Sequence, residues 1–136
     1  MKHITKIAAI IMLPILFSTS KAFGQNQANL NQITGSGYQK ADAELNSIYK
    51  QIVKQYASDT SFISHLKASQ RLWIKFRDAE LLMKYPPRET DYYGSAQSSC
   101  EANYLEQLTR DRIKTLKVWI DGIEEGDLCS GSVKNK

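Results

Sequence analysis

Apolar residues recur at intervals of three and four along three stretches of this chain, and no other sequence feature constrains the fold as strongly. Side chains with this spacing lie on one face of an α-helix. The stretches cover residues 38–57, 61–85 and 97–123. None of them alternates apolar and polar residues with a period of two, so the sequence predicts helices and no sheet.

The residues that should face the core follow from the same spacing. In the first helix they are Ala41, Leu45, Ile48, Ile52 and Tyr56. In the second they are Phe62, Leu66, Ser69, Trp73, Phe76, Glu80 and Met83, flanked by Ile63, Ile74 and Leu81. In the third they are Leu105, Leu108, Arg112, Leu116, Trp119 and Ile123. Three such helices, joined by one short and one longer connection, predict an all-α, antiparallel three-helix up-down-up bundle. An extra N-terminal helical turn is expected around residues 28–33.

Proline and glycine mark the ends of the predicted helices. Tyr85-Pro86-Pro87 ends the second helix, because proline lacks a backbone N–H and restricts the residue before it. Gly126 ends the third helix. We therefore expect a polar N-terminal segment over residues 25–37, a helical domain over residues 38–126 and a flexible tail over residues 127–136.

Residues 1–24 have the features of a cleaved secretory signal peptide. Lys2 and Lys6 lead into an apolar run over residues 7–17, and Ala22 and Gly24 stand at the minus-three and minus-one positions. The run is shorter than the roughly 20 residues that a membrane span needs. We expect a product that begins near Gln25 and is periplasmic or secreted. An uncleaved N-terminal anchor is the alternative, which the cleavage-site residues disfavour.

Loss of the signal changes the charge of the protein. The whole chain has 18 basic and 14 acidic residues, and Lys2, Lys6 and Lys21 leave with the signal, so 15 basic residues remain and the net charge is +1. No basic run interleaved with aromatic residues remains, so no nucleic-acid partner is expected. No later apolar run compares with that of the signal, so no membrane partner is expected after cleavage.

Charged residues on the predicted inner faces need partners, because a charge seldom lies unpaired in a core. Trp73, Arg77 and Glu80 lie along one side of the second helix, close to Asp78. Arg112 lies on the apolar side of the third helix. We expect an ion pair between Arg112 and Glu80, or Asp78, with the Trp73 ring against the guanidinium. Asp78 and Glu80 point in different directions and make a poor acid–base pair, so this cluster is predicted to be structural.

The chain lacks the residue patterns of the common enzyme classes. Its one histidine beyond the signal, His65, has no matching serine or cysteine signature. Zinc-ligand spacing, a phosphate-binding glycine loop and a dinucleotide fingerprint are also missing from the sequence. We expect no enzyme activity, no metal and no cofactor.

The connection between the second and third helices is the best candidate for partner binding. It contains Tyr85, Arg88, Tyr92 and Tyr93, and two prolines stiffen its start. Tyrosine and arginine dominate binding hot spots, because they combine a large contact area with polar groups. The same tyrosines also suit a role in sealing the end of the bundle. The composition fits both interpretations.

Several motifs together resemble the LprI-type lysozyme-inhibitor domain family of small exported bacterial proteins. They are Asn26-Gln27, Leu30-Asn31, Tyr38, the run from Ala41 to Asn46, Gln70-Arg71-x-Trp73-x-x-Phe76-Arg77-Asp78-Ala79-Glu80, Gly94-Ser95, Cys100 and Leu108-Thr109-x-x-Arg112-x-x-x-Leu116. The resemblance implies a helical, exported protein and, for a named family member, inhibition of lysozyme. We expect an extracytoplasmic binding or inhibitor module that acts on lysozyme or another envelope protein. An envelope structural or interaction domain without inhibitory activity is the alternative.

The two cysteines leave three outcomes open. Family domains commonly have cysteines where Ile33 and Leu81 stand here, which leaves Cys100 without its implied partners. Cys100 lies near the start of the third helix and Cys129 follows its end, about 30 Å away at the rise of an α-helix. They pair within one chain only if the tail folds back along the helix; free thiols and an intermolecular disulfide are the alternatives. Under the alternative of an envelope structural or interaction protein, the chain would self-associate through Cys129 or through the flank of the second helix, Ile63, Ile74 and Leu81.

Overall fold

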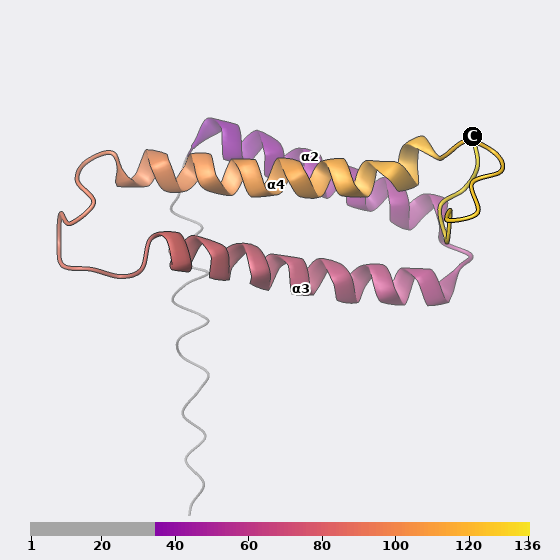
Figure 1. Ribbon diagram of the computed structural model, residues 1–136, viewed down its shortest axis with the longest axis horizontal. Coiled ribbons are helices and arrows are strands. Elements are labelled where there is room, and N and C mark those ends of the chain that lie inside the picture. Colours follow the sequence, from indigo (N-terminus) through magenta and orange to yellow (C-terminus); the bar gives the residue numbers. More distant parts are fainter. Residues whose placement is uncertain (1–34) are drawn as a thin grey trace, which may run out of the picture.

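The computed structural model describes residues 35–136, which form three antiparallel helices (Figure 1). These are α2 (Ser36–Gln55), α3 (Thr60–Lys84) and α4 (Gln97–Asp121). The predicted all-α up-down-up bundle is confirmed. The helical turn expected around residues 28–33 and the predicted signal peptide lie outside the described residues.

The ends of the helices follow from local chemistry. The Asp59 carboxylate accepts a hydrogen bond from the backbone N–H of Phe62 at 2.9 Å, which caps the start of α3. The helix ends at Lys84, and its C-cap residue, Tyr85, stands directly before two prolines. Gly122 follows α4 with a φ of 70°, a left-handed conformation that costs glycine little. α4 therefore ends at Asp121, two residues before the predicted end at residue 123, and the glycine that stops it is Gly122 and not Gly126.

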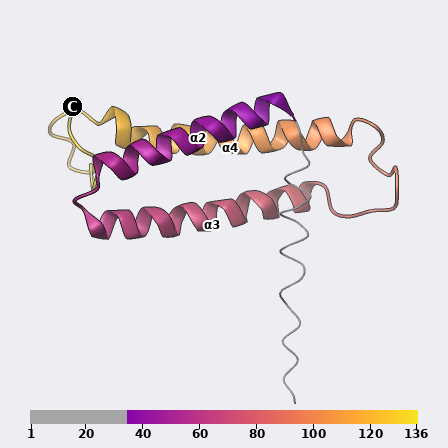
Figure 2. The same ribbon diagram turned by 180° about the vertical axis from the view of Figure 1, so that it is seen from behind.

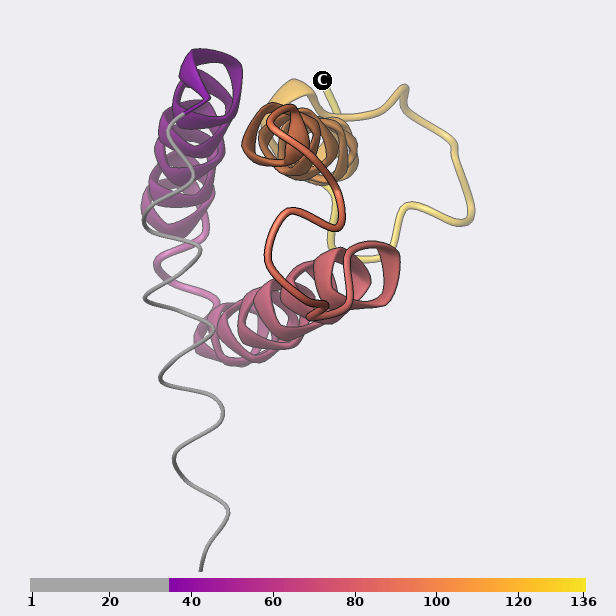
Figure 3. The ribbon, with the colours of Figure 1, turned by 90° about the vertical axis from the view of Figure 1, so that its left-hand side faces the viewer.

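The closest helix pair is α2 with α4, which lie side by side in the view along the bundle (Figure 3). A glycine just before α2 permits this approach. A Cβ atom at Gly35 would collide with Ala102 on α4, whereas one at Gly37 would meet only the movable carboxylate of Glu106. The core between the helices contains all five residues predicted for α2, together with residues of α3 and α4: Ala41, Leu45, Ile48, Ile52, Tyr56, Leu66, Ile113 and Leu116.

α3 lies alone on one side of the α2–α4 pair (Figures 1 and 2). Its buried residues are Leu66, Arg77 and Leu81. The predicted inner face of this helix is therefore partly wrong: Phe76 is 52% exposed and Met83 is 69% exposed. The reason is that Arg77 and Leu81 occupy the inward positions, which turns Phe76 and Met83 outward.

The C-terminal segment lies across the end of the bundle. Ile123 and Asn135 form an isolated parallel bridge, and the Ile123 N–H donates to the Lys134 carbonyl at 3.1 Å. The Lys134 N–H donates to the Tyr56 hydroxyl at 3.2 Å, and the Trp119 indole N–H donates to the Ser132 hydroxyl at 3.0 Å. These bonds join the segment predicted as a flexible tail to α2 and α4, a placement that the sequence did not predict.

Among residues 35–136, no helix combines the length and the apolar character that crossing a membrane requires.

Candidate partner-binding site

The connection between α3 and α4 projects from one end of the bundle (Figure 1). Its fold is set by short-range hydrogen bonds. The N–H groups of Tyr92, Gly94 and Gln97 donate to the carbonyls of Glu89, Asp91 and Gly94, respectively. Asp91 has a φ of 66°, a left-handed conformation that is uncommon for residues other than glycine. This series of turns gives the connection a defined course.

Three of the four predicted binding residues form a contiguous aromatic cluster. The rings of Tyr85 and Tyr93 meet edge to face with centroids 5.7 Å apart, and those of Tyr93 and Tyr92 do so at 4.9 Å. The Tyr93 hydroxyl donates to the Pro86 carbonyl at 2.9 Å. Edge-to-face contacts of this kind stabilise a fixed arrangement of rings. The fourth residue, Arg88, joins the cluster through its guanidinium, which lies 5.7 Å from the centre of the Tyr92 ring.

The four residues differ in exposure. Tyr85 is partly buried against the small core around Leu81 and Leu105, and Tyr93 is also partly buried. Tyr92 is 67% exposed and Arg88 is exposed. Tyr85 and Tyr93 thus occupy positions that seal the end of the bundle, while Arg88 and Tyr92 face solvent.

Two residues that the sequence analysis missed hold the base of this connection. The Tyr104 hydroxyl donates to Glu80 Oε2 at 3.0 Å, which joins α4 to α3. The Lys84 Nζ lies 3.8 Å from the centre of the Tyr104 ring. The hydrogen bond to Glu80, followed by burial, raises the pKa of Tyr104. Tyr104 precedes the predicted inner face of its helix by one position, and nothing in its spacing indicated a polar partner.

The predicted ion pair between Arg112 and Glu80 does not form. The Arg112 guanidinium donates instead to Gln70 Oε1 at 3.1 Å and to the Ser69 hydroxyl at 3.0 Å. Glu80 is occupied by Tyr104, and Asp78 is occupied by Arg77. The expected contact with Trp73 is present, with Arg112 lying 5.9 Å from the ring centre. Partial burial lowers the pKa of Arg112.

Arg77 is the arginine that carries the charged cluster. It is 5% exposed and donates through Nε and Nη2 to Asp78 Oδ1, at 3.0 and 2.8 Å. Its Nη1 lies 3.8 Å from Asp42 on α2. The guanidinium lies between the rings of Trp73 and Tyr38, at 5.4 and 5.9 Å from their centres. Its hydrogen bonds thus stay within α3, and its contacts with Asp42 and Tyr38 reach across to α2.

Both cysteines are free and exposed. Cys100 lies in the first turn of α4, whereas Cys129 lies in the segment that crosses the other end of the bundle. That segment does not fold back along α4, so the arrangement disfavours a disulfide within one chain. The proposed self-association face is also occupied: Leu81 is buried, and Ile63 packs against the core.

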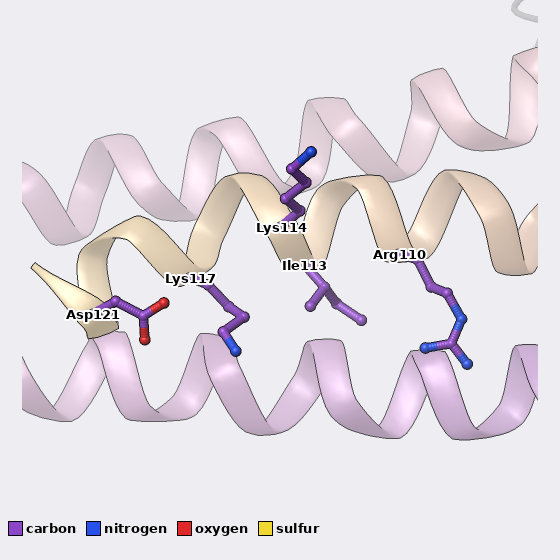
Figure 4. A pocket seen from close by; sticks show the side chains of 5 residues that line it. All are labelled: Arg110, Ile113, Lys114, Lys117 and Asp121. Carbon is purple, nitrogen blue, oxygen red and sulfur yellow. The ribbon is translucent and has the colours of Figure 1, made fainter.

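A shallow hollow of about 400 Å³ lies beside α4 and is lined by Arg110, Ile113, Lys114, Lys117 and Asp121 (Figure 4). Arg110 is already paired with Glu106 and Glu44. The lysines and Asp121 are exposed, so the hollow offers opposed surface charges and no buried polar group. Within residues 35–136, no cluster of histidine, cysteine and acidic residues suits a metal ion. The connection between α3 and α4 is therefore the strongest candidate site.

These features define a small helical domain with a projecting, tyrosine-rich connection between its last two helices. A family model described as "Lysozyme inhibitor LprI" matches residues 18–116. An uncharacterized protein of Rhizobium meliloti (strain 1021) is 31% identical over 111 residues, which cover 73% of this chain and 77% of that protein. No solved structure matches. The chain belongs to the LprI lysozyme inhibitor family.

The family match covers only part of the residues that the structure describes. It spans α2, α3, the connection between α3 and α4, and most of α4. The C-terminal segment that contains Ser132 and Lys134 lies beyond it. The candidate site is thus part of the family domain, whereas the bonds across the end of the bundle are formed by residues outside the match.

Proposed function

We propose that this protein is an extracytoplasmic inhibitor of lysozyme that acts through the exposed end of the connection between α3 and α4. The observation that supports this most directly is the family match, which includes that connection. The structure adds a rigid base and two exposed side chains, Arg88 and Tyr92. Preorganised side chains of this type lose little entropy on binding.

The chemistry of the proposed contact follows from the lysozyme cleft. Lysozyme cleaves its substrate with two carboxylic residues that flank the glycosidic bond. A guanidinium can donate two parallel hydrogen bonds to a carboxylate. We infer that Arg88 engages a carboxylate of the cleft, with the Tyr92 ring packed against the wall where a sugar would lie.

The charges around Arg88 suit a basic enzyme. Glu89 and Asp91 are both exposed in the same connection. Lysozymes are often strongly basic, so these two carboxylates favour the approach of such an enzyme to this end of the bundle. The same complementarity is missing on α3, where the exposed charges are basic, so lysozyme should dock on the connection and not on α3.

The test is inhibition of lysozyme by purified protein and by two variants, Arg88→Ala and Tyr92→Ala. Truncating a hot-spot residue typically costs about 2 kcal/mol, which corresponds to about 30-fold weaker inhibition. Val118→Ala and Leu128→Ala are matched controls, because both side chains are exposed apolar groups at the other end of the molecule. Tyr93 is left intact because its hydrogen bond to Pro86 shapes the connection.

The alternative function is an envelope interaction module without inhibitory activity. The near-neutral charge that follows from signal cleavage supports it, because the protein as a whole would have no acidic field to attract a basic enzyme. Equal inhibition by the wild type and both variants would move the inhibitory site elsewhere. No inhibition of any lysozyme type at micromolar protein would favour the alternative.

A further inference from the structure

Three large apolar side chains on α3 face solvent in a line. Leu72 is 66% exposed, and Phe76 and Met83 are also more than half exposed. They follow one another at intervals of four and seven residues, so they lie within about 40° of each other around the helix. Ala79 falls within the same line and is exposed. The line runs along the side of α3 away from the buried Arg77 and Leu81.

Basic residues border this line on one side. Lys67, Arg71 and Lys75 are exposed and spaced by four residues, which makes a second row parallel to the first. None of the three has an ion-pair partner within residues 35–136. The two acids of α3 are less exposed and engaged, Asp78 by Arg77 and Glu80 by Tyr104. We call these two rows together the outer face of α3.

The position of α3 makes this face accessible to a flat surface. α3 forms one edge of the molecule, with α2 and α4 together on its other side (Figures 1 and 2). The face is a ridge along a helix and not a groove. A protein partner would need a matching groove for such a ridge, whereas the interface of a bilayer deforms around it.

We propose that the outer face of α3 binds an anionic phospholipid surface. Leu72, Phe76 and Met83 enter the boundary between headgroups and acyl chains, as the apolar side of an interfacial helix does. Lys67, Arg71 and Lys75 contact lipid phosphates while their aliphatic stems lie along the apolar region. A second copy fits less well, because pairing two such faces would bring basic rows close together.

This binding needs no membrane span. The sequence predicted no membrane partner after signal cleavage because it contains no second long apolar run. An interfacial helix is recognised instead by an apolar line beside a basic row, and that arrangement depends on which face the fold leaves exposed. The structure supplies that information.

The test is co-sedimentation of the exported, purified protein with vesicles of phosphatidylglycerol and phosphatidylcholine, or of phosphatidylcholine alone. One variant replaces the apolar line (Leu72→Ser, Phe76→Ser, Met83→Ser), and another replaces the basic row (Lys67→Gln, Arg71→Gln, Lys75→Gln). The matched controls are Val118→Ser with Leu128→Ser, and Lys40→Gln with Lys50→Gln and Lys114→Gln, which are exposed elsewhere. All proteins share one N-terminus, so its contribution is equal throughout.

We expect the wild type and both controls to bind the anionic vesicles, and binding to weaken with salt. Each basic residue at an anionic surface is worth about 1 kcal/mol, or about fivefold in affinity, so the basic-row variant should bind at least tenfold more weakly. The apolar-line variant should lose binding to a similar extent. Both variants should keep the lysozyme inhibition of the wild type, because neither touches the connection between α3 and α4.

Three results would overturn the proposal. The first is no binding of the wild type to anionic vesicles. The second is unchanged binding by the apolar-line variant, which would mean adsorption by charge alone. The third is a dimer of the wild type that this variant abolishes, which would assign the face to a second copy.

Discussion

Arg77 and Arg112 both lie near Trp73, but they have different consequences for stability. Arg77 is 5% exposed and contacts Asp78, Asp42 and two aromatic rings. Arg112 is only partly buried, and its partners, Gln70 and Ser69, are uncharged. Removing one partner of a buried ion pair leaves the other charge buried and unpaired. Removing an arginine whose partners are uncharged and near the surface leaves no such charge.

We therefore expect Arg77→Ala to destabilise the protein by about 3 kcal/mol, the lower end of the range for buried pairs, because Asp42 and Asp78 keep some contact with water. Arg112→Ala should cost only about 1 kcal/mol, the value of ordinary hydrogen bonds. Urea unfolding followed by circular dichroism measures both. Equal losses for the two variants, or a larger loss for Arg112→Ala, would contradict this assignment.

Three tyrosines make the stability of the folded protein depend on pH in the alkaline range. The pKa values of Tyr38 and Tyr85 are raised chiefly by burial, and that of Tyr104 chiefly by its hydrogen bond to Glu80, from an ordinary value of 10.0. Because the folded state holds these protons more tightly than the unfolded state, the stabilisation is complete below pH 10 and is lost as pH rises through the raised pKa values.

Thermal melting between about pH 9 and pH 11 tests this coupling. The melting temperature should fall with rising pH, and Tyr104→Phe should show a shallower fall because one of the three phenols is gone. Tyr92→Phe is the matched control, since Tyr92 is exposed. A slope in Tyr104→Phe as steep as that of the wild type would mean that Tyr104 does not contribute.

At the level of the helices, the spacing of apolar residues predicted well that the three helices exist and how they run. It predicted less well which side of each helix faces the core. All five residues assigned to the inner face of α2 are buried, because that helix packs closely along α4. α3 has apolar residues around much of its circumference, so spacing alone did not decide which line faces inward. The inward position of Arg77 allows its contact with Asp42 on α2, and this contact joins residues far apart in the sequence.

For the candidate site too, the sequence predicted which residues belong together but not which of them are exposed. Composition identified Tyr85, Arg88, Tyr92 and Tyr93 as a group, and the structure places them together. It did not reveal which of them are exposed, since that depends on the hydrogen bond from Tyr93 to Pro86 and on the packing of Tyr85. Tyr104 and Lys84 were missed because their contacts cross between helices.

The C-terminal segment should stabilise the bundle in spite of its polar composition. Lys134 Nζ donates to the Gln55 carbonyl at 2.9 Å and lies 4.4 Å from the centre of the Tyr56 ring. A cation at the C-terminus of α2 also interacts favourably with the helix dipole.

Deleting residues 130–136 should therefore lower the free energy of unfolding by about 1–3 kcal/mol, the sum of a few hydrogen bonds. Chemical denaturation of the full chain and of the truncated protein measures the difference. Deleting only residues 135–136 removes the bridge to Ile123 but retains Lys134 and Ser132, so it should cost a smaller part of this difference. An unchanged stability after the longer deletion would support a flexible tail, as the sequence analysis expected.

At the scale of the whole molecule, the proposed activities use separate surfaces. The exposed end of the connection between α3 and α4 has two acidic residues beside Arg88, whereas the outer face of α3 is basic. A membrane-bound molecule would keep the connection between α3 and α4 at its end, away from the length of α3 that contacts lipid (Figure 1). Inhibition of lysozyme close to an envelope membrane would follow from this division.

Export by a cleaved signal peptide is a prediction from the sequence of residues 1–24. The exported protein should begin at Gln25, because Ala22 and Gly24 suit a signal peptidase. Intact mass measurement without reduction identifies the N-terminus and, in the same spectrum, the state of the two cysteines. A mass that includes residues 1–24 would contradict cleavage, and a mass two hydrogens lighter than the dithiol form would reveal a pairing of Cys100 with Cys129.

In the proposed complex, Arg88 and Tyr92 occupy the substrate cleft of lysozyme. The most direct measurement is the affinity of the protein for lysozyme, determined by calorimetry with and without a saturating substrate-like oligosaccharide. We predict that the oligosaccharide weakens binding of the wild type in proportion to its own occupancy of the cleft. Binding of unchanged affinity to oligosaccharide-filled lysozyme would contradict the claim, because the two ligands would then occupy different sites.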